Sequence, residues 1–546
     1  MGLLMLYYET AYSLENTCVN QNKVEINEEV GEKSVDLKQV TNGTGYNQSE
    51  LRTIEIHKEP GMEGAIKSEQ LIRERENFSD TPIYASNSPE SSPLSSPVAK
   101  IKWKGLNSFS AADCITMRPI NPPDVTIGVS KNHVAQMVHN SIQVWDKSGN
   151  PLVKESLYDF FNVSRENYLT DPEIIYDNTS GNWFSTIVDG GTEVRTENNY
   201  SSWSCKPAGC SVILVKSSND NPIQNRSILR INASSPDFFP DQPKVAVNKF
   251  NLLVTTSEFN ITNEAETLSF AYMIDKEFRN IFDALPWDVK PWGSSQHFAL
   301  QVSSPSNCTY SAALVKEDRL AIDSNVSLIQ IAEYCDNTDI ATLFGPYPVP
   351  LPSESKLVPA PKFKQPINQP LVNEIDLAIS SGIHNGQSAW ITLHAACQPV
   401  SISDHSCVRI LKFDRIPAED KYILAENTQF HINDTDVYYP AIGITRDGKV
   451  FFISGFSNSS TFPSLAVSQL KSENQTMVVY RIFGSDINNS TRYGDYFGSA
   501  IDPIDGSVWL SGEYVDGSLS IPVPAEFEDI PNVRENTWST IIANVS

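Results

Sequence analysis

One strand–turn–strand unit recurs along this chain, and its clearest copy spans residues 492–514. Small and apolar residues occupy positions 498–501, the pair Asp505-Gly506 follows, and residues 508–510 resume a β-branched and aromatic pattern. An Asp-Gly pair between two such runs is a strong signal for a tight hairpin turn. The unit therefore predicts two short antiparallel strands, and most of the chain after about residue 120 can be aligned with it.

Seven such units can be traced, each with three to four short strands, at uneven spacings of about 50 to 80 residues. Helical periodicity is nearly absent. Small residues stand in the expected first strands and tryptophans in several second strands, at Gly128, Ala246, Ala299, Ala378, Gly443 and Ala500 and at Trp183, Trp390 and Trp509. Small side chains suit a crowded strand near an axis, and large rings suit packing between blades. The sequence predicts an all-β fold over residues 105–546, a β-propeller with seven blades as the favoured count.

The fourth unit, around residues 297–302 and 328–332, is the weakest copy. Eight prolines follow it between Pro346 and Pro370. Proline has no backbone N–H and cannot donate to a strand ladder, so we expect this connection to be loop or extended coil.

The first hundred residues have a different composition. Residues 1–13 hold a short apolar run without a preceding basic segment, and we interpret them as a signal segment truncated at its start. Residues 14–104 are rich in Glu, Asn and Ser and include a Ser/Pro run at 86–97, so they bury too little apolar area to offset their ordering entropy. We predict a disordered stalk or linker there. No run of 18 uninterrupted apolar residues occurs, so we expect no membrane-spanning helix.

Cysteines and glycosylation motifs indicate an oxidising compartment. Six of the eight cysteines form three short-range pairs within units, namely Cys205 with Cys210, Cys308 with Cys335, and Cys397 with Cys407, which leaves Cys18 and Cys114. Short-range pairs of this kind are typical of disulfides in secreted proteins. Seventeen Asn-x-Ser/Thr sequons occur, against roughly seven expected by chance. We expect a glycoprotein that is extracellular or lies at the cell surface.

The third cysteine pair has a competing interpretation. His394 and His405 flank Cys397 and Cys407, and these four residue types could bind zinc. In an oxidising compartment, a disulfide across a hairpin loop with bystander histidines is the favoured interpretation.

An acidic residue stands at the start of several expected inner strands: Asp124, Asp171, Asp241, Asp376 and Asp495, with Asp436 slightly upstream in the sixth unit. On a propeller, equivalent positions form a ring at one mouth of the central channel, where crowded carboxylates would attract a hard cation such as Ca²⁺. The alternative is that Asp suits the turns before strands through its local backbone hydrogen bonds. In either case the ring marks a face on which a ligand could bind. Beyond this calcium site, no metal or other cofactor is expected.

Three stretches, residues 122–138, 171–184 and 493–514, resemble motifs of secreted prokaryotic β-propeller proteins that are sialidase-like in architecture and largely without assigned activity. The resemblance spans about 420 residues and implies a fold and an extracellular location, but little function.

Charge and missing motifs narrow the function. A net charge of -25 would repel a phosphate backbone, so nucleic acid is excluded as a partner. Sialidases need an arginine cluster and Asp-box turns, of which residues 118–120, 178–183 and 505–509 are only fragments, and no Gly-x-Ser-x-Gly motif marks a serine nucleophile. We expect a non-enzymatic binding or adhesion module for an extracellular protein or glycan. A glycoside hydrolase and a structural envelope component are the alternatives, and no catalytic residue or oligomeric state is assigned.

Overall fold

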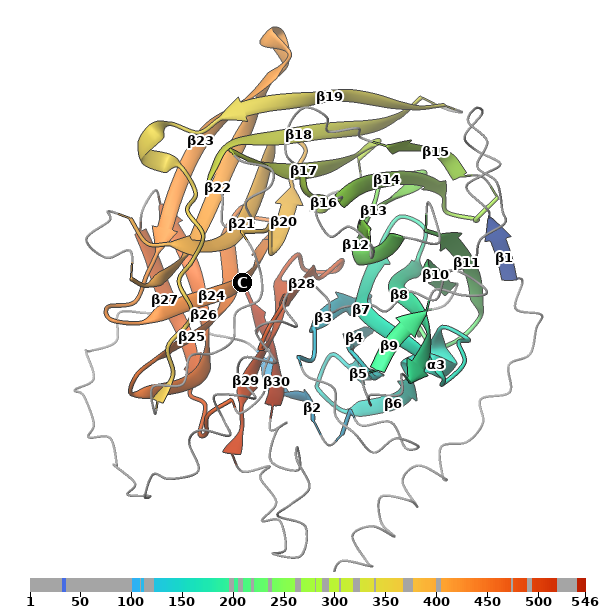
Figure 1. Ribbon diagram of the computed structural model, residues 1–546, viewed down its shortest axis with the longest axis horizontal. Coiled ribbons are helices and arrows are strands. Elements are labelled where there is room, and N and C mark those ends of the chain that lie inside the picture. The colour runs from blue at the N-terminus through green and yellow to red at the C-terminus, as the bar shows by residue number, and fades with distance from the viewer. Residues whose placement is uncertain are drawn as a thin grey trace, which may run out of the picture.

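The structure is a computed structural model (Figure 1), and it describes residues 32–35, 101–108, 110–111, 122–195, 201–204, 210–217, 220–233, 238–260, 267–279, 281–286, 294–303, 306–317, 325–337, 340–366, 377–398, 404–472, 475–488, 493–517 and 538–546. The predicted signal segment at 1–13 and nearly all of the predicted stalk at 14–104 therefore lie outside the described residues.

The strands form four-stranded antiparallel blades around a central axis, and successive strands of a blade pair side by side (Figure 1). The first blades in chain order are β3 (Thr126–Val129), β4 (His133–Val138), β5 (Ser141–Asp146) and β6 (Pro151–Ser156); β7 (Asn167–Asp177), β8 (Asn182–Arg195), β10 (Ser211–Ser217) and β11 (Arg226–Asn232); β12 (Phe238–Val247), β13 (Asn251–Asn260), β14 (Thr267–Asp275) and β15 (Ile281–Pro286). Next come β16 (Ser294–Val302), β17 (Cys308–Lys316), β18 (Val326–Asn337) and β19 (Ile340–Pro350); β20 (Ser381–His384), β21 (Ser388–Ala396), β22 (Ser406–Ile416) and β23 (Lys421–Phe430); β24 (Asp436–Ile444), β25 (Val450–Asn458), β26 (Thr461–Ser472) and β27 (Gln475–Ile482).

The last blade joins the two ends of the propeller. It contains β28 (Gly498–Ile501), β29 (Val508–Val515), β30 (Trp538–Val545) and β2 (Ile101–Asn107), and β2 pairs antiparallel with β30. Strand β2 begins upstream of residue 105, and its alternation of Ile101 and Trp103 with two lysines is the sequence signal for it. Closure of this kind removes the exposed edges of an open sheet.

The remaining elements are small. Strand β9 (Ser201–Ser204) pairs with β8, and β1 (Glu32–Val35) pairs in parallel with β11. The described helices are α3 (Leu157–Phe160), η2 (Ser353–Ser355) and η5 (Pro417–Glu419), none long and apolar enough to cross a membrane. The prediction of an all-β propeller is confirmed. The count of seven blades stays a prediction, because a short parallel contact between β16 and β20 joins two blades into one eight-stranded sheet.

Packing between blades explains the small residues of the inner strands. A Cβ atom on Gly128 would lie 2.7 Å from the ring of Trp183 on the next blade, and a Cβ on Gly443 would lie 2.4 Å from Val508. Trp183 and Trp509 are buried in the clusters that join neighbouring blades. At these two places a second-strand side chain packs against a position where the inner strand of the neighbouring blade has no side chain.

The proline-rich connection was predicted as loop, and that prediction is wrong for its first part. Strand β19 contains Pro346, Pro348 and Pro350 and pairs along its length with β18 alone. Because the prolines occupy alternate positions, their nitrogens face the same side of the strand, and the ladder continues through the residues between them. Proline is tolerated in edge strands for this reason.

Two of the three predicted disulfides are present, Cys308–Cys335 and Cys397–Cys407. Cys308 and Cys335 lie directly opposite each other on β17 and β18. Cys210 is disulfide-bonded, whereas Cys205, its predicted partner, lies outside the described residues, as do Cys18 and Cys114. The disulfide between Cys397 and Cys407 removes the two thiolates on which the zinc interpretation depended.

Candidate functional site at the two ends of the central channel

The inner strands give the channel two ends with different chemistry. Each inner strand runs toward a hairpin turn at one end of the channel, and on β7 Asp171 lies six positions before Asp177, the last residue of the strand. At about 3.3 Å per residue, these two positions lie about 20 Å apart along the strand. We call the first region the strand-start end and the second the hairpin end.

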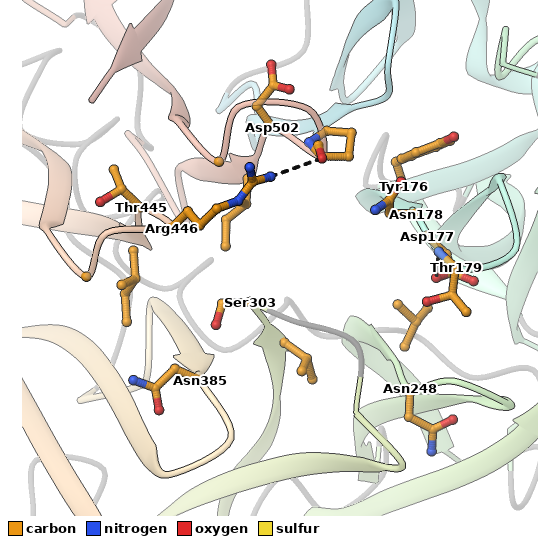
Figure 2. A pocket seen from close by; sticks show the side chains of 17 residues that line it. Tyr176, Asp177, Asn178, Thr179, Asn248, Ser303, Asn385, Thr445, Arg446 and Asp502 are labelled. Carbon is orange, nitrogen blue, oxygen red and sulfur yellow. Dashed lines mark hydrogen bonds between the residues drawn. The ribbon is translucent and has the colours of Figure 1, made fainter.

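A pocket of about 460 Å³ opens at the hairpin end, and we call it the hairpin pocket. Figure 2 shows polar side chains from several blades around its open centre: Tyr176, Asp177, Asn178, Thr179, Asn248, Ser303, Asn385, Thr445, Arg446 and Asp502. A volume of this size lies within the range of about 300–1,000 Å³ that is usual for small-molecule sites. The sequence interpretation did not find this pocket.

Short polar residues at the ends of the inner strands fold the turns that line the pocket. The Oδ1 atom of Asp177 accepts from the backbone N–H of Thr179 at 2.9 Å. Asn385 Oδ1 accepts from the N–H of Ser388 at 2.8 Å, and Asp502 Oδ1 accepts from the N–H two residues later at 2.9 Å. Asp and Asn favour such turns because their side chains replace a backbone acceptor. The Asp-Gly and Ser-Gly turn signals in the sequence fall in these hairpins.

The floor of the pocket is apolar. Val247, Val302, Ile444 and Ile501 contribute aliphatic surface. A narrower cavity of about 80 Å³ continues between the inner strands and shares Val247, Val302, Ile501 and Tyr176 with the pocket. The hairpin pocket is therefore a polar rim above an aliphatic floor.

Both carboxylates of the pocket are already paired with lysines. Lys276 Nζ lies 2.5 Å from Asp177 Oδ2, and both side chains are buried. Lys147 Nζ lies 2.9 and 2.7 Å from the two carboxylate oxygens of Asp502, which also accepts from Trp509 Nε1 at 3.1 Å. These ion pairs neutralise the acids and hold the hairpins in place.

The strand-start end is buried and acidic. Burial raises the pKa of Tyr496 well above its ordinary value, and the nearby carboxylates of Asp124, Asp171, Glu173 and Asp495 raise it further. The Tyr496 hydroxyl donates to the carbonyl oxygen of the residue after Asp171 at 3.0 Å. A protonated tyrosine thus stands among these acids.

Two basic side chains, Lys244 and His139, lie against these acids. Lys244 Nζ lies 2.5 Å from Glu173 Oε1 and 3.4 Å from the centre of the Tyr496 ring. His139 Nε2 lies 3.1 Å from Asp124 Oδ2, and both of these side chains are buried. The strand-start end is therefore a packed network of charged and aromatic groups.

The predicted acids share an unusual backbone conformation. Asp124, Asp171 and Asp495 have φ values of 48°, 56° and 115°, and Gln242 and Tyr439 have 43° and 47° near the starts of their own inner strands. Asp is one of the few residues that tolerate positive φ. At Asp171 the kink coincides with a shift of register between β7 and β8, and the interpretation of these acids as turn formers stays a prediction.

Three of the five predicted site acids, Asp124, Asp171 and Asp495, meet around Tyr496. Asp241 lies on β12 directly before the kink, and Asp376 lies outside the described residues. Among the residues that the structure describes, no three or more His, Cys, Asp or Glu side chains form a group that could hold a metal ion. The calcium site stays a prediction.

A buried layer lies behind these acids. Gly494 donates its backbone N–H to Glu513 Oε2 at 3.2 Å, and burial raises the pKa of Glu513 well above its ordinary value. The ring of His394 meets Tyr439 and Phe363 edge-on, at 5.0 and 5.3 Å between ring centres. Burial lowers the pKa of His394 to about 4, so this histidine is neutral at pH 7.

Solved structures with a similar arrangement include two sialidases and a polysaccharide lyase. The Trypanosoma rangeli sialidase is 10% identical with a TM-score of 0.37, over 82% of this chain and 60% of that chain. The Hadza microbial sialidase Hz136 is 9% identical with a TM-score of 0.34, over 69% and 70% of the two chains. The polysaccharide lyase Uly1 is 9% identical with a TM-score of 0.41, over 79% of this chain and 91% of that chain.

The chain spans about three fifths of the length of the Trypanosoma rangeli sialidase structures that it matches. No known protein family matches it, and no curated protein matches it. What the two channel ends can bind or catalyse is therefore inferred from this chain's own residues.

Proposed function

We propose that this protein is an extracellular binding module that holds a saccharide in the hairpin pocket. The observation that carries the proposal is the combination of a polar rim, with amide, hydroxyl and guanidinium groups from several hairpins, and an aliphatic floor. Sugars present hydroxyl groups around their edges and C–H groups on their faces. A pocket with a few placed polar groups above apolar surface matches both features.

Rim groups are placed to recognise hydroxyl groups. Asn178 and Thr179 are exposed at the lip, and Ser303 and Asn385 stand on the facing side of the opening (Figure 2). Amide and hydroxyl groups both donate and accept hydrogen bonds, as sugar hydroxyls do. Because the hairpins are fixed by their own turn hydrogen bonds, little ordering entropy opposes binding.

The paired acids favour binding over hydrolysis at this pocket. A glycosidase of the common type needs one carboxylic acid that donates a proton and a second carboxylate as base or nucleophile. Asp177 and Asp502 are each held by a lysine in a charge-assisted hydrogen bond, so both carboxylates of the pocket are already engaged with the fold. At the strand-start end, the raised pKa of Tyr496 argues against a tyrosine nucleophile.

An extracellular location is supported by the two disulfides, which are typical of oxidising compartments. Several sequon asparagines outside the pocket, among them Asn162, Asn225 and Asn433, are exposed and could carry glycans. Asn544 could not carry a glycan in the folded protein, because it is 3% exposed and its side-chain amide donates to Ser507 Oγ at 2.6 Å.

A glycan array tests the proposal on the full chain. The parent protein should bind one class of saccharide, and Ser303→Trp, which fills the pocket from its wall, should weaken that binding at least tenfold. Ser459→Trp places the same side chain on an exposed turn after β25 and should leave binding unchanged. If the parent binds no saccharide, or if the Ser303 variant binds as the parent does, the proposal is wrong.

A further inference from the structure

Charged residues of opposite sign line the hairpin pocket. Three of its lining residues are charged: Asp177, Arg446 and Asp502. Lys276 neutralises the first acid and Lys147 the second. Among the charged side chains that line the pocket, only Arg446 therefore lacks a partner of opposite charge in the described part of the chain.

Arg446 makes only neutral contacts among the described residues. Its Nη2 donates to the backbone carbonyl oxygens of Ile504 at 3.0 Å and Pro503 at 3.3 Å. Asp447, the acid next to Arg446 in the same turn, forms an ion pair with Lys449, with 2.9 Å between Lys449 Nζ and Asp447 Oδ2. The Arg446 side chain is exposed, and no carboxylate of the described residues forms an ion pair with it. The Nε and Nη1 groups have no hydrogen-bond partner in the described part of the chain.

Two adjacent blades hold Arg446 in place. Its backbone N–H donates to the carbonyl oxygen of Gly506 at 3.0 Å, and this hydrogen bond joins the β24–β25 turn, which contains Arg446, to the β28–β29 turn, which contains Gly506. A Cβ atom on Gly506 would lie 2.4 Å from the Cβ of Arg446, so only glycine permits this close approach. The two contacts with carbonyl oxygens then orient the guanidinium at the pocket, and the dashed line in Figure 2 marks the contact with Pro503.

We propose that Arg446 makes the hairpin pocket selective for an acidic saccharide, one that carries a carboxylate or a sulfate ester; this rests on the proposed function above. A guanidinium presents parallel N–H donors that match two oxygens of such an anion.

The size of the preference follows from the strength of charge-assisted hydrogen bonds. An acidic saccharide should bind about ten to a hundred times more tightly than the same saccharide with its charge masked. Arg446→Gln should abolish this ratio. Arg446→Lys keeps the charge without the planar fork, so it should retain a smaller ratio.

The experiment compares matched pairs of glycans on the full chain by array binding followed by calorimetry. Oligogalacturonides are compared with their methyl esters, and sulfated galactan oligosaccharides with their desulfated forms. Lys131→Gln is the control variant, because it removes one positive charge from the exposed turn after β3 without touching the pocket. It should leave the acid preference unchanged, and the melting temperatures of all variants should match that of the parent.

The outcomes separate this inference from the proposed function. Preference for the acidic partner of either pair, lost in Arg446→Gln and kept in Lys131→Gln, supports the inference, and the preferred pair identifies carboxylate or sulfate. Equal binding of acidic and neutral partners, removed by Ser303→Trp, overturns the inference and leaves the proposed function standing. Absence of any saccharide binding overturns both.

Discussion

The two ends of the channel are built from the same strands, yet they treat their acids differently. At the hairpin end, Asp177 and Asp502 cap turns and pair with lysines, and they leave an open pocket beside them. At the strand-start end, Asp171 and Asp495 lie in left-handed kinks beside the buried Tyr496. An acidic residue near a propeller axis is therefore no sign of a binding site by itself. Solvent access distinguishes the two ends.

The largest expected difference between the ends comes from two glycines with similar backbones. Gly494 at the strand-start end has φ +88° and Gly386 at the hairpin end has φ +92°. A Cβ on Gly494 would lie 2.0 Å from the Tyr439 ring, whereas a Cβ on Gly386 would meet nothing within 4 Å. Gly386→Ala should cost about 1 kcal/mol from backbone strain alone. Gly494→Ala should cost about 3 kcal/mol or more because overpacking is added.

Urea unfolding of the two glycine variants measures this difference directly. Equal losses of unfolding free energy in both variants would contradict the contrast between a packed end and an open end.

The sequence predicted the turns and the inner-strand packing because both depend on local residue types. Gly448 and Gly506 have φ values of +83° and +71° in the hairpins where Asp-Gly pairs predicted turns. The small residues of the inner strands were also predicted from residue type, and packing against neighbouring blades explains them. The hairpin pocket could not be predicted, because Tyr176 and Asp502 are 326 positions apart in the sequence and come to the same pocket only when the propeller closes.

The sequence predicted that the strand-start acids lie together, and the calcium site proposed for them stays a prediction. Their spacing along the chain predicted a shared location, and Asp124, Asp171 and Asp495 do approach Tyr496. The residues that decide the chemistry there, Glu173 and Lys244, follow the kinks by two or three positions and carry no motif. The prediction at the β19 prolines was wrong because an edge strand tolerates proline, which has no backbone N–H, whereas a central strand does not.

Calcium tests whether the strand-start end binds a ligand after all. If its acids hold Ca²⁺, a hundredfold excess over the dissociation constant should stabilise the fold by about 2.7 kcal/mol. The rise in melting temperature should disappear in Asp171→Asn/Asp495→Asn. The same calcium response in parent and double variant, or none in the parent, would leave these residues as turn formers only.

Acid sensitivity should come in part from the buried layer behind the strand-start end. The pKa of His394 is lowered from its ordinary 6.5 to about 4, so the unfolded chain takes up a proton between these values and the folded chain does not. Stability should fall as the pH falls through this window, by about 2 kcal/mol between pH 7 and pH 5. His394→Phe should remove this loss, because phenylalanine fits among the neighbouring rings.

The comparison requires unfolding curves at both pH values, since other buried acids add their own dependence. His431→Phe changes an exposed histidine and serves as the control. If the parent and His394→Phe lose the same stability on acidification, His394 takes up its proton over the same pH range in the folded and unfolded chains, and the predicted contribution is wrong.

The smallest expected effect belongs to the hairpin end. Arg446→Gln should change the unfolding free energy by no more than about 0.5 kcal/mol, because the side chain is exposed and its contacts are to backbone carbonyls. A larger loss in thermal or urea unfolding would show that Arg446 serves the fold instead of a ligand.

A crystal structure of the full chain with its best saccharide ligand tests the central claim most directly, because it shows which end of the channel is used. The account predicts ligand density in the hairpin pocket, in contact with Arg446 and with the Ser303 and Asn385 side of the rim. Ligand density at the strand-start end, against Asp171 and Asp495 with the hairpin pocket empty, would contradict it.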